Sequence, residues 1–166
     1  MSWPGPLTVG GNSVTLHGSA QSIYKQILLL SPEYDPHRAQ KLGPQKRDDG
    51  GMVTCSGDPV PEPWKWCAEG FRYLEALGGG ESGCMVGANT CARVSCSTSC
   101  GIFLCNKCEG DFWLLCRNIV SDMAVILGLC TTWDWESQAI WGGGRLDYEG
   151  YWTEMMEVDC AVLDDE

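Results

Sequence analysis

Eleven cysteines constrain what this chain of 166 residues can fold into more than any other feature. All of them follow Arg47, and five stand within ANTCARVSCSTSCGIFLCNKC, residues 88–108. Cysteines at this density are typical of a zinc site or of an oxidised disulfide framework. Whether the cysteines bind zinc or form disulfides restricts the cellular compartments and the functions that are possible for this chain.

The spacing of the cysteines favours disulfides over zinc. Cys96 with Cys100, and Cys105 with Cys108, are closely spaced pairs of the kind that make a thiolate zinc site. Only four residues separate these pairs, far fewer than the usual ~12–20, and the other cysteines would have no role. We therefore expect no metal and no cofactor, with mostly free thiols as a third alternative.

An odd number of cysteines allows at most five disulfides and leaves one thiol free or paired with another chain. The connectivity cannot be deduced from the spacing. The disulfide candidates are Cys55, Cys67, Cys84, Cys91, Cys96, Cys100, Cys105, Cys108, Cys116, Cys130 and Cys160.

The composition changes at about residue 47. Residues 1–47 are rich in Gly, Ser and Pro at the start and polar at the end, which predicts a flexible N-terminal or pro-like segment. Residues 48–166 would form the cysteine-rich domain. Lys46-Arg47 is a candidate site for a kexin-type protease, although a solvated charge pair is the simpler interpretation. Neither the basic nor the apolar region of a signal peptide is evident at the start.

The cysteine-rich part is strongly acidic, with six basic and twenty acidic residues after Arg47. Contacts to phosphates require clustered Lys and Arg, so we expect no nucleic acid partner. No apolar run approaches the ~20 residues that span a bilayer, so we expect no membrane span.

Hydrophobic periodicity predicts two helices. After Pro63, the residues Trp64, Cys67, Phe71 and Leu74 share one helical face, and Gly78–Gly80 would end that helix. The second helix ends at Cys130, and its apolar face begins at Cys116.

Short runs of β-branched and apolar residues predict strands at Met52–Ser56, ARVSC and GIFLC. A closing strand would follow, with one face formed by Trp152, Met156, Val158, Cys160 and Val162. The expected fold is a small disulfide-stapled α+β domain whose short, mostly antiparallel sheet packs with two helices.

No catalytic motif is evident, and the interpretation leans away from an enzyme. The only histidines, His17 and His37, precede Arg47 and would contribute only if that segment folded back. Asp147 and Glu149 lie beside aromatic residues and could suggest glycoside hydrolysis. With twenty acidic residues in this region, such pairs arise by chance, so we assign no catalytic residue.

Tryptophan supplies the candidate binding residues. Trp64 and Trp152 fall on predicted core faces, whereas Trp133, Trp135 and Trp141 lie in the loop-like stretch TTWDWESQAIW. Exposed aromatic rings near carboxylates could stack on sugars or anchor a protein partner. The alternative is that they cover a thin core.

Three segments of the chain resemble parts of small cysteine-rich secreted proteins of filamentous fungi. They are CARVSCSTSCGIFLCNK, WKWCAEGFRYLEALGG and WGGGRLDYEGYWTEMMEVDC. The resemblance extends from Val53 to Cys160. It implies a common cysteine set of Cys91, Cys96, Cys105, Cys116, Cys130 and Cys160. Cys100 and Cys108 would be additions that pair with each other.

The resemblance also implies an effector-like protein, secreted and acting in virulence. The first functional hypothesis is therefore a protein that binds an extracellular host or competitor target. The second is a module that binds cell-wall glycans through the Trp133–Trp141 loop. The third is an accessory protein of a fungal biosynthetic pathway.

Overall fold

The computed structural model describes residues 1–8, 11–35, 50–77 and 83–161. The helices are α1 (Ala20–Leu30), α2 (Pro63–Trp66), α3 (Ala68–Leu77) and α4 (Cys116–Cys130). The strands are β1 (Ser2–Pro6), β2 (Ser13–His17), β3 (Met52–Thr54), β4 (Val60–Pro61), β5 (Cys84–Val86), β6 (Cys91–Ser97), β7 (Cys100–Asn106), β8 (Phe112–Leu114), β9 (Thr131–Asp134), β10 (Ala139–Gly142), β11 (Gly144–Asp147) and β12 (Tyr151–Glu157).

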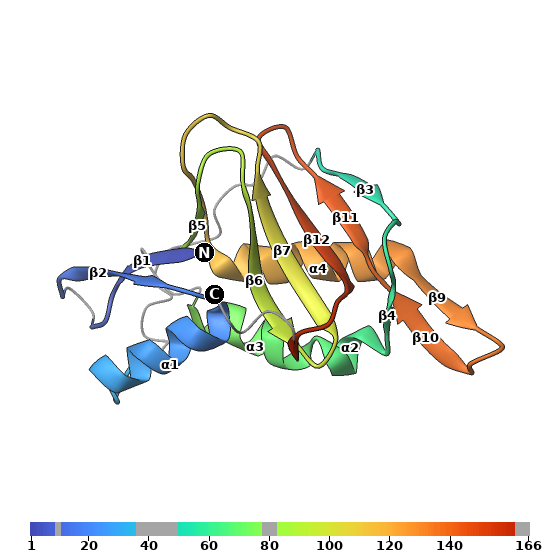
Figure 1. Ribbon diagram of the computed structural model, residues 1–166, viewed down its shortest axis with the longest axis horizontal. Coiled ribbons are helices and arrows are strands. Elements are labelled where there is room, and N and C mark those ends of the chain that lie inside the picture. Colours follow the sequence, from blue (N-terminus) through green and yellow to red (C-terminus); the bar gives the residue numbers. More distant parts are fainter. Residues whose placement is uncertain (9–10, 36–49, 78–82, 162–166) are drawn as a thin grey trace.

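The predicted α+β class is confirmed, with more elements than the periodicity indicated. The described strands form three antiparallel sheets, in the orders β2-β1-β5-β8, β4-β10-β9 and β3-β11-β12-β7-β6. Helix α4 lies behind the five-stranded sheet and contacts β11 and β12, while α3 packs against α4 (Figure 1). No described helix is both long and apolar enough to cross a membrane.

The core lies between the five-stranded sheet and α4. The helix buries Ile119, Met123 and Ile126, and the sheet contributes Ile102 and Met155 from β7 and β12. Burial of such side chains is worth ~1.5–3 kcal/mol each, which makes this layer the main source of stability.

One polar contact also joins α4 to the sheet. Asp122 is fully buried, and its carboxylate accepts hydrogen bonds from the Tyr148 hydroxyl at 3.0 Å and the Thr153 hydroxyl at 3.1 Å. The buried carboxylate is therefore hydrogen-bonded by side chains from the sheet side of the core.

The described residues 1–8 and 11–35 differ from the flexible segment that composition predicts. Trp3 of β1 is fully buried, and its indole Nε1 donates to the Leu77 carbonyl at 3.1 Å. Ile23 and Ile27, one helical turn apart in α1, enter the same core. The apolar run IYKQILLL is long enough to form an amphipathic helix, capped by Ser19. Lys46-Arg47 lies outside the described residues.

Five disulfides link the cysteines, as predicted from their density. They are Cys55–Cys130, Cys67–Cys100, Cys84–Cys116, Cys91–Cys105 and Cys96–Cys160, and Cys108 is unpaired and exposed. In the described part of the chain, no three His, Cys, Asp or Glu residues gather as metal ligands.

The expected pairing of Cys100 with Cys108 is wrong. Cys100 begins β7 and is buried, where it meets Cys67 between α2 and α3. Cys108 lies two residues past the end of the same strand and is exposed. The two ends of an extended seven-residue strand are too far apart for one disulfide.

Three consecutive glycines carry the chain from one sheet to the next. Gly142 ends β10, Gly144 begins β11, and Gly143 joins them. A Cβ atom would lie 2.9 Å from the Met155 carbonyl oxygen at Gly143 and 2.6 Å from the Thr54 carbonyl oxygen at Gly144. This approach of two backbones is possible only without side chains.

Two predicted core faces need correction. In β12 the buried residues are Thr153 and Met155, so Trp152 and Met156 lie on the opposite, outward face. Val158 and Cys160 lie beyond the end of the strand, and Val162 is outside the described residues.

Trp64 was also expected in the core but is 57% exposed. The helical pattern predicts one continuous helix, whereas in the structure Cys67 separates α2 from α3. Helix α3 is described as far as Leu77, and the glycines predicted to end it, Gly78–Gly80, lie outside the described residues.

Intact mass of the native protein tests the disulfide framework. Without reductant, one thiol, Cys108, is expected to react with an alkylating agent, and after reduction eleven should react. Cys108→Ser should remove the one reactive thiol. Peptide mapping should recover the Cys67–Cys100 link, and recovery of a Cys100–Cys108 link would contradict the fold described above.

Trp3→Ala tests whether the N-terminal strand belongs to the core. Because Trp3 is fully buried, we expect the free energy of unfolding to fall by about 3–5 kcal/mol in guanidinium denaturation. Trp64→Ala removes the same side chain from an exposed position and should cost less than about 1 kcal/mol. Equal effects of the two substitutions would show that residues 1–35 do not stabilise the domain.

Candidate functional site

The stretch expected as a loop after Cys130 is a β-hairpin. Strands β9 and β10 pair in antiparallel register over four residues, from Thr131 opposite Gly142 to Asp134 opposite Ala139. Figure 1 shows this hairpin projecting from one end of the molecule, away from the helices and the five-stranded sheet.

Asp134 shapes the turn of the hairpin. Its carboxylate accepts hydrogen bonds from the backbone N–H of Glu136 at 3.1 Å, the backbone N–H of Ser137 at 3.2 Å and the Ser137 hydroxyl at 2.5 Å. Asp and Ser, which here stand three residues apart, are common in such turns because their short side chains hydrogen-bond the nearby backbone. The sequence WDWES therefore folds locally as a tight, polar turn.

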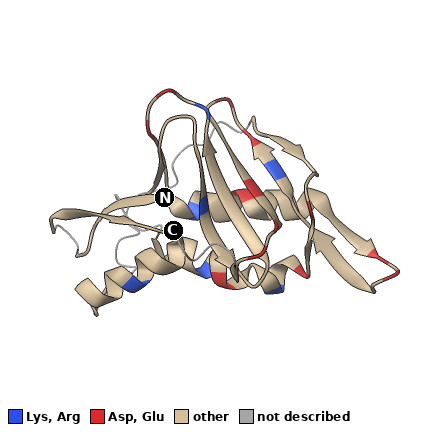
Figure 2. Cartoon of the chain, in the orientation of Figure 1, with Lys and Arg blue, Asp and Glu red and all other residues tan. Residues whose placement is uncertain are grey.

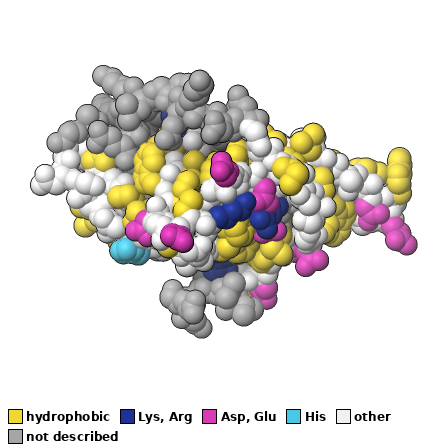
Figure 3. All heavy atoms as spheres, turned by 90° about the horizontal axis from the view of Figure 1, so that it is seen from above, with side chains coloured by type: hydrophobic (Ala, Val, Ile, Leu, Met, Phe, Trp, Pro, Cys, Tyr) yellow, Lys and Arg dark blue, Asp and Glu magenta, His cyan; other side chains and the backbone are white. Residues whose placement is uncertain are grey.

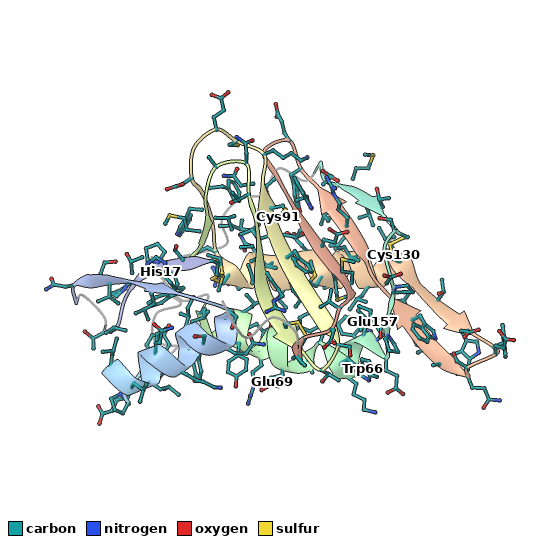
Figure 4. The ribbon with its side chains drawn as sticks, viewed as in Figure 1. His17, Trp66, Glu69, Cys91, Cys130 and Glu157 are labelled. Carbon is teal, nitrogen blue, oxygen red and sulfur yellow. A yellow bond between two sulfur atoms is a disulfide. The ribbon has the colours of Figure 1, made fainter. Side chains whose placement is uncertain are left out.

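The base of the hairpin is fixed to the domain. Cys130, the residue before β9, is bonded to Cys55 at 2.02 Å between the sulfur atoms, and Figure 4 shows this disulfide where the hairpin leaves the body. On the other strand, Trp141 pairs with Pro61 of β4, and the Glu62 N–H donates to the Ile140 carbonyl at 2.7 Å. The hairpin is thus held on both strands.

One face of the hairpin exposes apolar side chains, which we call the hairpin patch: Trp133, Trp135 and Ile140. Trp133 and Ile140 are direct cross-strand partners and so share a face. The Trp135 ring lies 6.0 Å from the Trp133 ring at an interplanar angle of 76°. The three residues are 48%, 84% and 40% exposed, respectively.

Trp141, the third tryptophan singled out from the sequence, lies on the opposite face. It is paired with Thr132 in register, and its indole Nε1 donates to the Ser137 hydroxyl at 3.0 Å. The structure therefore brings Trp133 and Trp135 together and separates Trp141 from them. Ile140 and the turn residue Asp134 are features of this site that the sequence pattern did not indicate.

The hairpin is also acidic. Residues 131–142 contain Asp134 and Glu136 and no basic residue. Figure 2 shows acidic positions at this end of the chain, and Figure 3 shows acidic side chains there. The hydrogen bonds from the Ser137 hydroxyl and the Glu136 N–H lower the pKa of Asp134 below its ordinary value. Asp134 is consequently ionised at neutral and mildly acidic pH.

The carboxylate pair considered for glycoside hydrolysis is differently placed. Asp147 lies on the outward face of the five-stranded sheet, 2.5 Å from Lys107 Nζ and 2.9 Å from Arg145 Nη2, whereas Glu149 is exposed beyond β11. Burial by itself would raise the pKa of Asp147, but the hydrogen bonds from Arg145 and Lys107 outweigh it and lower the pKa overall. Asp147 therefore remains an ion-paired carboxylate and is unsuited to act as a general acid.

Arg145 and Lys107 also contact an aromatic ring. Arg145 Cζ lies 4.0 Å above the ring of Trp152, and Lys107 Nζ lies 5.6 Å from the same ring centre. These cations thus join Asp147 and Trp152 into one network on the sheet. The network explains why Trp152 is half-buried on a face without a helix.

His17, the histidine that the structure describes, does not approach the hairpin patch. His17 ends β2, and its Nδ1 is 3.1 Å from the Ser2 hydroxyl. Figure 4 places His17 at the opposite end of the molecule from Cys130. His37 lies outside the described residues.

Comparison with known proteins does not assign this chain to a family. No protein-family model matches the chain, and neither a curated protein nor a solved structure matches it.

The Asp147 network gives a pH-dependent prediction. A carboxyl whose pKa is lowered by folding stabilises the fold above its unfolded pKa, and this contribution is lost as the pH falls through the folded value. We expect Asp147→Asn to reduce the free energy of unfolding by about 1 kcal/mol at about pH 7, and by much less at about pH 2. Urea denaturation at both pH values measures this difference.

Glu149→Gln is the matched control, because Glu149 is exposed two residues away. It should change the stability little at either pH. A deficit for Asp147→Asn that is the same at both pH values would contradict the role assigned to its ion pairs.

Proposed function

We propose that this chain is a secreted, effector-like protein that acts by binding an extracellular host or competitor protein through the hairpin patch. The observation that carries the proposal is a projecting hairpin with exposed indoles, anchored at its base by a disulfide. The fold would serve as a rigid support, and the hairpin would provide the contact surface.

The oxidised cysteines support the secreted part of the proposal. Ten of the eleven cysteines are in disulfides, which form and persist in oxidising compartments and are rare in the cytosol. Each native disulfide of a small secreted domain contributes ~2–5 kcal/mol. A domain crosslinked in this way would resist unfolding and proteolysis outside the cell.

The exposure of the hairpin patch supports binding. Trp135 is 84% exposed at the tip, where it covers no core. Tryptophan is enriched among the interface residues that contribute most to affinity, because its large ring buries much apolar surface at low entropic cost. Covering Trp133, Trp135 and Ile140 would thus give a partner a compact apolar contact.

The glycan-binding alternative has less support from the geometry. A flat platform for successive sugar rings needs aromatic faces that lie roughly in one plane, whereas the Trp133 and Trp135 rings are inclined at 76°. Trp141, the third residue of that hypothesis, lies on the other face of the hairpin. The alternative of an accessory protein in a fungal biosynthetic pathway gains no additional support from the described residues.

A capture experiment tests the proposal. Disulfide-intact protein is immobilised and exposed to extracellular host fluid, using wild type, Trp135→Ala and Trp64→Ala. We expect wild type and Trp64→Ala to retain the same protein and Trp135→Ala to bind it about 30-fold more weakly, which corresponds to a hot-spot loss of about 2 kcal/mol.

Retention on chitin, glucan and cellulose is measured in parallel with the same variants. Equal capture by Trp135→Ala would exclude the hairpin patch as the binding surface. Retention on a glycan that depends on Trp135 would replace the protein target with the carbohydrate alternative.

A further inference from the structure

We infer that the hairpin patch recognises a cationic segment of its target, with a Lys or Arg side chain seated against the two indoles. This inference rests on the proposed function, since it names the chemistry of the partner that the patch would bind. Three properties of the hairpin lead to it: the ring geometry, the local charge and the free state of the indole faces.

The ring geometry provides aromatic faces for a cation. The faces of indoles carry negative electrostatic potential, and Trp binds cations more strongly than Tyr or Phe does. Trp133 and Trp135 lie edge to face, 6.0 Å apart at 76°, so the faces of the two rings point in different directions. An ammonium or guanidinium group placed over one of these faces would contact the π-system of that ring and pack its alkyl stem on the patch.

The charge around these rings has one sign. Asp134 and Glu136 flank Trp135 directly in the sequence, and the twelve residues 131–142 hold no Lys or Arg. The whole chain carries a net charge of −11. The resulting potential attracts basic partners and repels acidic ones, including a second copy of this chain.

The carboxylates retain the capacity to bind. Asp134 accepts one hydrogen bond on Oδ1 and two on Oδ2, out of roughly four lone-pair positions on a carboxylate. Along β9, Asp134 alternates with Trp133, and the Ser137 hydroxyl that it binds also accepts from Trp141 Nε1. Its carboxylate therefore lies on the Trp141 face and adds to the negative potential of the hairpin tip, rather than forming a contact within the hairpin patch. For Glu136, no described residue provides a hydrogen bond or an ion pair to the side chain.

On the five-stranded sheet, a tryptophan ring and a carboxylate of this chain already contact cationic side chains. Trp152 on the sheet is contacted by Arg145 at 4.0 Å and by Lys107 at 5.6 Å, and Asp147 binds both cations. At the hairpin the indoles and the carboxylates are present, but among the described residues no cation lies over Trp133 or Trp135. The partner would therefore supply the cation that the sheet supplies to Trp152.

Titration with charged peptides tests the inference on the full, disulfide-intact chain. The probes are hexalysine, hexaarginine and hexaglutamate, and the signals are the tryptophan indole N–H resonances in ¹⁵N NMR spectra. Hexalysine or hexaarginine should shift the resonances of Trp133 and Trp135 and leave those of Trp3 and Trp64 in place. Hexaglutamate should shift none of them.

Charge variants separate a specific site from general attraction. Asp134→Asn/Glu136→Gln leaves both indoles in place and should weaken binding of the basic peptide up to about tenfold, a loss of the size expected for two solvent-exposed charge contacts. Asn at position 134 keeps one acceptor oxygen, which can still accept the hydrogen bond from the Glu136 N–H, whereas the bonds from Ser137 to the second oxygen are lost. Glu75→Gln/Glu109→Gln removes two exposed charges away from the hairpin and should leave the affinity unchanged.

Equal weakening by the two double variants would show that only the overall charge attracts the peptide and would overturn the inference. The capture experiment, repeated with the charge variants, distinguishes failure of this inference from failure of the proposed function. Capture that depends on Trp135 but not on Asp134 and Glu136 would keep the binding surface and reject the cationic partner. Capture that does not depend on Trp135 would reject the binding surface itself.

Discussion

Helix α4 is covalently fixed at both ends, and the rest of the structure depends on this constraint. Cys116 at its start is bonded to Cys84 of β5, and Cys130 at its end is bonded to Cys55, just after β3. Between these points the helix buries an apolar face against the sheet, and buried Asp122 accepts hydrogen bonds from the sheet side. A domain of this size has a thin core, so crosslinks and core packing together define a single arrangement.

The projecting hairpin is a consequence of that fixed helix. Strand β9 begins at the residue after Cys130, so the direction in which α4 ends also sets the direction in which the hairpin leaves the body. The glycines at 142–144 then return the chain to the five-stranded sheet through a space too narrow for side chains. A binding surface that is ordered before its partner arrives loses less conformational entropy on association, which favours affinity.

The local sequence predicts those helices and strands whose buried residues follow a simple pattern along the chain. The apolar residues of helix α4 recur at helical spacing, and strands β6 and β7 are short runs of β-branched and apolar residues, so both can be predicted from local sequence. The disulfide partners and the folding of residues 1–35 depend on contacts between distant segments, such as the bond from Trp3 to the Leu77 carbonyl, which spacing does not reveal. The sequence indicated Trp133 and Trp135 of the hairpin patch but wrongly grouped Trp141 with them. The strand register places Trp141 on the other face, and that register depends on the turn that Asp134 stabilises.

The claim that the Cys55–Cys130 disulfide orders the hairpin is tested most directly by amide hydrogen exchange. Exchange is followed by mass spectrometry in the native protein and in Cys55→Ser/Cys130→Ser. The account predicts that residues 131–142 are protected in the native protein and exchange faster in the variant, while β6 and β7 remain protected in both. Unchanged protection of residues 131–142 in a folded variant would contradict it, because the hairpin would then be ordered without its covalent anchor.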